Sequence, residues 1–64
     1  MPASKQREVI IEYAQYGSTL RVTAVDAETG LEVVFQVPAN ISMSEIERLA
    51  INKLTYVAEK QKKT

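Results

Sequence analysis

The fold is decided in residues 9–26, VIIEYAQYGSTLRVTAVD, where two strand-like segments meet at a glycine. β-Branched and aromatic residues are frequent on both sides of Gly17-Ser18, and such residues favour extended strands. A glycine followed by a small polar residue is typical of the two-residue turn that joins antiparallel strands. The stretch therefore predicts a β-hairpin, with strands over about 8–16 and 19–26.

The turn also predicts how these two strands pair. If Tyr16 faces Thr19, one face of the hairpin is almost entirely apolar, with the pairs Tyr13–Val22, Ile11–Ala24 and Gln15–Leu20. The other face carries the pairs Glu12–Thr23, Ala14–Arg21 and Ile10–Val25. Because a shift by one residue would exchange the two faces, an apolar face that must be buried fixes the register. We therefore expect Tyr13 to lie in the core.

A third strand extends the same apolar face. Asp26-Ala-Glu-Thr-Gly30 has the residues of a turn, with Asp at its start and a Gly that can take a positive φ. Apolar residues then alternate over about 31–37, which predicts a strand, and Pro38 is expected to end it. A four-residue loop would give the pairs Val22–Phe35, Ala24–Val33 and Leu20–Val37 on that face.

After Pro38 the apolar residues change to helical spacing, which predicts a helix over about 43–61. Ser42 and Glu45 have the spacing of a capping box, and Ser44 with Glu47 offers the same pattern. If Ser42 is the cap, Ile41 and Ile46 would form a hydrophobic staple.

Together these elements predict one α+β domain over residues 1–64. Its sheet is a three-stranded antiparallel meander in the order 1-2-3, with one C-terminal helix packed on one face, a β-β-β-α arrangement. We expect residues 1–6 and 62–64 to be disordered.

The composition excludes several kinds of chemistry. The chain has 64 residues and contains no Cys and no His, so thiol chemistry, histidine general bases and zinc fingers are absent. Asp26, Glu28 and Gly30 lack the spacing of a calcium-binding EF-hand loop. We therefore expect no catalytic residues, no cofactor and no metal. No apolar run is long enough for a membrane span or a secretory signal, so we expect no membrane partner and a cytoplasmic location.

One sheet face and the helix end remain as candidate binding surfaces. If one helix covers one face, the open face presents a candidate interaction face of Ile10, Ala14, Arg21, Val25 and Val34. This face predicts a protein partner or self-association, through the face itself or a strand edge. The alternative is that single valines and isoleucines on this face are merely solvated. Arg21 is expected to pair with Glu12 or Glu32.

The formal net charge of zero conceals an uneven distribution. Residues 1–52 carry four basic and seven acidic side chains, whereas residues 53–64 carry four lysines and one glutamate. The alternative function is that of a small nucleic-acid-associated regulatory protein. It would bind nucleic acid through a basic patch of Lys53, Lys60, Lys62 and Lys63. Lysines at a helix C-terminus also oppose the helix dipole, which explains them without a ligand. A subunit of a larger enzyme is a third hypothesis.

Several segments support a resemblance to a known family. They are residues 7–12, REVIIE; residues 24–33, AVDAETGLEV; residues 38–40, PAN; and residues 47–57, ERLAINKLTYV. On these residues the chain resembles a family of very short, uncharacterised alphaproteobacterial proteins classed as a domain of unknown function. The resemblance implies a bacterial cytoplasmic protein, and it implies no catalytic residue, ligand or partner.

Overall fold

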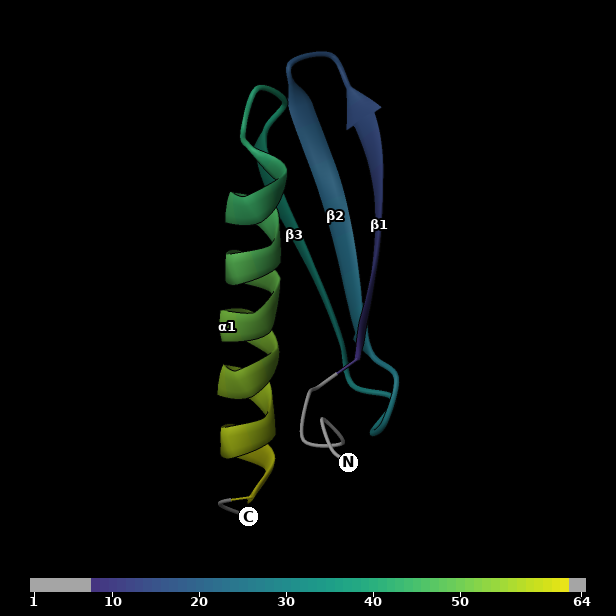
Figure 1. Cartoon of the computed structure of the whole chain (residues 1–64), viewed down its shortest axis with the longest axis vertical. Coiled ribbons are helices and arrows are strands. Elements are labelled where there is room, and N and C mark those ends of the chain that lie inside the picture. Colours follow the sequence, from purple (N-terminus) through teal and green to yellow (C-terminus); the bar gives the residue numbers. More distant parts are fainter. Residues whose placement is uncertain (1–7, 63–64) are drawn as a thin grey trace.

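The computed structural model describes residues 8–62 and has the predicted β-β-β-α arrangement. The strands are β1 (Val9–Tyr16), β2 (Thr19–Asp26) and β3 (Glu32–Pro38), and α1 (Met43–Lys62) follows them. Figure 1 shows the strands side by side with β2 in the centre and α1 alongside one face. Lys62 is the last residue of α1; the other residues expected to be disordered, 1–6 and 63–64, lie outside the described residues.

The strand register agrees with the prediction at every named pair. Between β1 and β2 the paired residues run from Val9–Asp26 to Tyr16–Thr19. Between β2 and β3 they run from Val25–Glu32 to Thr19–Pro38. Pro38 is thus the last paired residue of β3 and not the residue beyond it. A proline fits there because β3 is an edge strand. An N–H group at this position would point away from β2, so its absence costs no hydrogen bond within the sheet.

Local turn chemistry sets both connections between strands. Gly17 has a φ of 62°, which the two-residue hairpin turn requires at its first position. In the second turn Gly30 has a φ of 81°. The buried Asp26 carboxylate accepts hydrogen bonds from the backbone N–H groups of Glu28 at 2.9 Å and Thr29 at 3.3 Å. Asp26 therefore holds the turn closed through its side chain as well as its backbone.

Ser42 begins the helix, as one of the two predicted caps. Its Oγ accepts a hydrogen bond from the Glu45 N–H at 3.2 Å, and its carbonyl accepts one from the Ile46 N–H at 3.1 Å. The Glu45 carboxylate pairs with Arg48, so only one half of the capping box forms. Ile41 packs against the core cluster that contains Ile46, as the predicted staple requires.

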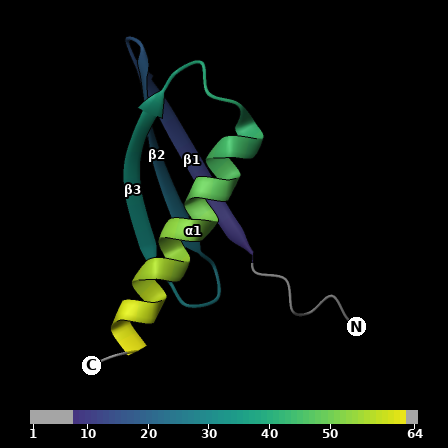
Figure 2. The same cartoon turned by 90° about the vertical axis from the view of Figure 1, so that its left-hand side faces the viewer.

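The core lies between α1 and the helix-facing side of the sheet, in two clusters. Near the start of α1, Ile46 packs with three buried residues of the sheet, Leu20, Val22 and Val37. Further along, Ala50 and Leu54 pack with Ala24. The two alanines are fully buried in this cluster, where α1 packs on the central strand. Figure 2 shows α1 crossing the sheet obliquely.

The prediction that Tyr13 lies in the core is wrong, because half of this side chain is exposed. Tyr13 does lie on the helix-facing side of β1, in register with Val22. The loop between β1 and β2, however, extends beyond the first turn of α1 (Figure 1). The helix therefore leaves this end of the outer strand uncovered, which a strand pattern alone cannot reveal.

Candidate functional site

The outer edge of β1 carries main-chain groups that point away from the sheet. The Glu8 carbonyl accepts a hydrogen bond from the Ala27 N–H at 3.0 Å, so even-numbered residues of this segment bond to β2. Antiparallel strands alternate between bonded and non-bonded pairs. The N–H and C=O groups of the intervening residues therefore face the open edge, and these residues are Val9, Ile11, Tyr13 and Gln15. Such a row is a template for another strand.

The side chains beside this edge are unusually apolar for exposed positions. Ile10, Tyr13 and Tyr16 are 50%, 50% and 60% exposed. Among the eight residues of β1 only Glu12 is charged, and the strand contains no lysine and no proline. Lysine and proline on an edge strand commonly prevent it from pairing with a strand of another chain. Within the described residues, the β1 edge is therefore long and apolar and lacks these protective devices.

The β3 edge is shorter and better protected. The Ala39 N–H donates to the Ser18 carbonyl at 2.8 Å, which places the odd-numbered residues of β3 in the bonded pairs with β2. The residues with outward main-chain groups are then Glu32, Val34, Gln36 and Pro38. Pro38 has no N–H, and its carbonyl accepts from the Ile41 N–H at 3.1 Å. A partner strand would thus find fewer groups on β3 than on β1.

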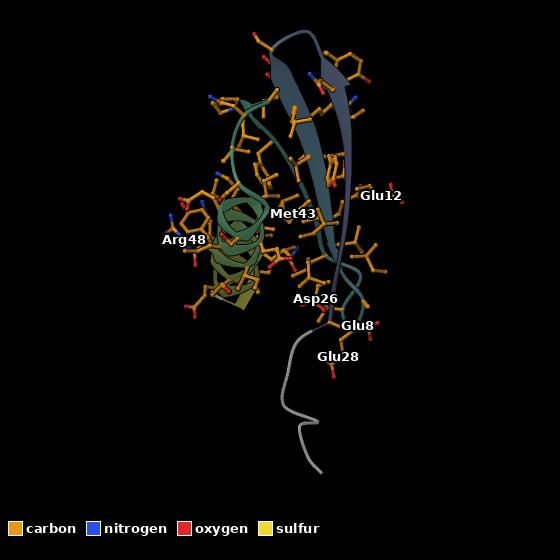
Figure 3. All side chains as sticks on the ribbon, turned by 45° about the horizontal axis from the view of Figure 1, so that its top comes forward. Glu8, Glu12, Asp26, Glu28, Met43 and Arg48 are labelled. Atoms are coloured by element: carbon orange, nitrogen blue, oxygen red, sulfur yellow. The ribbon has the colours of Figure 1, made fainter. Side chains whose placement is uncertain are left out.

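A shallow hollow of about 240 Å³ lies beside the β1 edge. One of its lining residues, Ala14, is opposite Arg21, and Glu12 is the neighbouring residue of β1 on the same face. The remaining lining residues are Tyr13, Tyr16 and Thr23. Figure 3 shows Glu12 projecting from β1 on the side away from α1. The hollow therefore has an acidic and a basic side chain at its borders.

The expected pairing of Arg21 with Glu12 or Glu32 is wrong. In the described part of the chain the ion pair joins Arg48 to Glu45 on the outer side of α1, where Figure 3 places Arg48. Arg21 is opposite Ala14 and Gln36, so Glu12 is displaced by two residues and Glu32 by four residues from a directly facing position. The Arg21 and Glu12 side chains are both exposed on the open face of the sheet, and they carry opposite charges.

All five residues of the predicted interaction face lie on the open side of the sheet. Ile10 faces Val25 across the first two strands, and Val34 is diagonal to Val25. Ala14 and Arg21 belong to the hollow, and the Glu12–Thr23 pair separates them from Ile10. The face thus consists of an apolar group near Asp26 and a charged hollow near the hairpin turn. Sequence reasoning missed the contribution of Tyr13, which the exposed end of the hairpin adds.

The predicted basic patch is not brought together among the described residues. The Lys53 Nζ lies 5.4 Å from the centre of the Phe35 ring, and the Lys60 Nζ lies 5.5 Å from that of Tyr56. Seven residues of helix separate the two lysines by about 10 Å. Lys62 ends α1, with a side chain that is not described, and Lys63 lies outside the described residues. Each described lysine thus covers an aromatic ring of its own chain.

A second hollow, of about 400 Å³, lies between α1 and β3. It is lined mainly by apolar side chains and by the polar Asn52 and Lys53, the full set being Val33, Val34, Leu49, Asn52, Lys53, Tyr56 and Val57. Lys53 at its border contacts Phe35, which belongs to the core. This groove is open to solvent, and its residues Val33 and Leu49 also pack against the core clusters.

Three further observations concern metal binding, the buried carboxylate of Asp26 and membrane insertion. Residues 8–62 contain no group of three or more acidic side chains that could hold a metal ion. The buried Asp26 carboxylate accepts hydrogen bonds from backbone N–H groups of its own turn, which is a structural use of the group. In the same part of the chain, no helix is both long and apolar enough to cross a membrane.

Residues 6–61 match a protein family described as a domain of unknown function, DUF6898. The chain belongs to this family. The match covers all three strands and nearly all of α1, so the resemblance stated from the sequence is confirmed for the DUF6898 family. Neither the curated proteins nor the solved structures include a significant match to the chain.

Proposed function

We propose that this member of the DUF6898 family is a non-enzymatic protein–protein interaction module that binds its partner through the edge of β1. The observation that carries the proposal is the outward row of main-chain donors and acceptors on a strand with three half-exposed, large apolar side chains. Strand addition gives affinity through main-chain hydrogen bonds and specificity through neighbouring side chains. The module would act in the bacterial cytoplasm, as the resemblance implied.

The small size of the domain also supports an interaction role. Among the described residues, seven apolar residues form the buried core, divided between two clusters. Domains of this size bury a limited fraction of their surface and commonly gain stability from association. A partner strand on β1 would cover Ile10, Tyr13 and Tyr16, which α1 leaves exposed. Binding and folding stability would then be coupled.

Co-purification from the native host tests this proposal. The bait would be the wild-type chain and a Tyr13→Pro variant, which loses one outward N–H of β1 without losing a bond to β2. Gln36→Pro is the matched control, because it removes one outward N–H from β3 instead. We expect a partner strand, from another protein or an untagged copy of this chain, to be retained by wild type and Gln36→Pro and lost with Tyr13→Pro. Equal retention by folded Tyr13→Pro would contradict the proposal.

A further inference from the structure

We infer that the partner strand is β1 of a second copy of this chain, paired antiparallel about a two-fold axis that passes beside Tyr13. The two sheets would join into one continuous sheet with both helices on the same face. This inference rests on the proposed function, and it adds the identity of the partner and the register of pairing. Three observations support it: the direction of the main-chain groups, the positions of the apolar side chains, and the charges around the hollow.

The main-chain geometry limits the registers that are available. The outward groups belong to the odd-numbered residues of β1, and residues that exchange hydrogen bonds across an antiparallel pair both point at the partner. Odd residues must therefore face odd residues, and the residue that faces its own copy near the middle of the strand is Glu12, Tyr13 or Ala14. Glu12 facing itself would place two carboxylates directly opposite each other, which is destabilising.

The register centred on Tyr13 covers the exposed apolar side chains together. On the helix side Tyr13 faces Tyr13 of the second copy. On the open side Ile10 faces Tyr16 of the second copy, and two-fold symmetry forms that pair twice. These residues are the three large exposed apolar side chains of β1. The register centred on Ala14 instead places Ile10 opposite Ser18, which lies beyond the end of β1, and Tyr13 opposite Gln15. In that register Ile10 and Tyr13 each face a polar residue, so their apolar side chains are covered less well.

The charges around the hollow fit the same register. With Tyr13 at the axis, Glu12 of the second copy faces Ala14, one of the residues that line the hollow. Arg21 is paired with Ala14 on the adjacent strand β2. Strands lie about 4.8 Å apart, so the Arg21 backbone is about 10 Å from that of the incoming Glu12, a span that the two long side chains bridge. The acidic side chain of each copy thus enters the hollow of the other, beside the Arg21 guanidinium, which has no ion-pair partner among the described residues.

Single-cysteine cross-linking tests the register, because the chain has no cysteine of its own. Facing Cα atoms in a hydrogen-bonded antiparallel pair lie about 5.5 Å apart, within disulfide range. In the proposed register the Glu12 positions of the two copies are displaced by two residues and lie about 8 Å apart, as do the Ala14 positions. We expect Tyr13→Cys to form a disulfide-linked dimer under mild oxidation, and Glu12→Cys and Ala14→Cys, as matched controls, to remain largely unlinked. Linking through either control in place of Tyr13→Cys would overturn the register.

Sedimentation over a range of concentrations tests the dimer without modification. We expect wild type to dimerise, Glu12→Arg and Arg21→Glu each to weaken dimerisation at least about tenfold, and the double variant to recover most of the loss. Circular dichroism of each variant would show that it is folded. A wild-type chain that stays monomeric, or a dimer that neither charge reversal affects, would overturn the inference. If wild type is monomeric yet retains a host protein that Tyr13→Pro loses, the proposed function stands and only the identity of the partner is wrong.

Discussion

Leu54→Ala should destabilise the fold strongly, whereas Ile51→Ala, three residues away on the same helix, should have little effect. Leu54 is 1% exposed in the second core cluster, and Ile51 is 45% exposed. Truncating Leu to Ala removes three carbon groups, which contribute about 0.8 kcal/mol each when buried. Adding a contribution from the cavity left behind, we expect Leu54→Ala to cost about 3 kcal/mol.

That cost is large for a chain of this length. Small domains have a free energy of unfolding of about 0.05–0.15 kcal/mol per residue, which corresponds to roughly 3–10 kcal/mol here. Ile51→Ala loses contacts on one side only and gains helix propensity, so its net cost should stay below about 1 kcal/mol.

Urea unfolding followed by circular dichroism would measure both effects at one protein concentration, since association would otherwise shift the midpoint. With a slope of about 1 kcal/mol per M, Leu54→Ala should lower the urea midpoint by about 3 M or leave the chain largely unfolded. Similar midpoints for the two variants, or a Leu54→Ala cost below about 1 kcal/mol, would show that α1 does not pack on the sheet through this face.

Three further predictions concern the turn, the helix cap and the alternative function. Asp26→Ala should lower the free energy of unfolding by about 2 kcal/mol, because two backbone N–H groups lose a charged acceptor, and Asp26→Asn should lower it less; urea unfolding of both variants would show whether the acceptor matters. Ser42→Ala should cost about 1 kcal/mol and Ser44→Ala much less, since Ser42 Oγ accepts from Glu45, and equal thermal shifts would contradict this assignment of the cap. In a titration with DNA and RNA at low salt we expect no binding; binding that falls steeply with salt and is reduced by Lys53→Ala or Lys60→Ala would favour the nucleic-acid alternative.

The contrast between the two sheet edges explains why β1 is the proposed binding edge. Both edges follow from the strand order 1-2-3, which leaves β1 and β3 with one neighbour each. On β3 the outward row ends at Pro38, and Lys53 of α1 reaches the ring of Phe35 on that strand. On β1 nothing comparable occurs within the described residues, and the hairpin end extends past the helix (Figure 1). Among the described residues, the β3 edge is therefore protected against pairing with another strand and the β1 edge is not.

Local signals in the sequence were sufficient for the strands, their register and the start of the helix. Gly17 at the hairpin turn, the alternation around Val22 and the cap at Ser42 act over a few residues, and a one-residue slip would move every apolar side chain to the wrong face. These features were predictable because neighbouring residues alone determine them.

The candidate site depended on how α1 crosses the sheet, which local patterns do not encode. Tyr13 alternates like a core residue, yet it is half exposed because the helix covers β2 and β3 better than the end of β1. Arg21 has Glu12 and Glu32 on its two neighbouring strands but pairs with neither, because the register displaces Glu12 by two residues and Glu32 by four from a directly facing position. Alternation gives the face on which a residue lies, whereas its exposure depends on where the fully buried Ala24 and Ala50 let the helix rest against the sheet. The sequence by itself thus determined the hairpin, the third strand, the strand order and the helix, and only tertiary packing decided that Tyr13 on β1 stays half exposed.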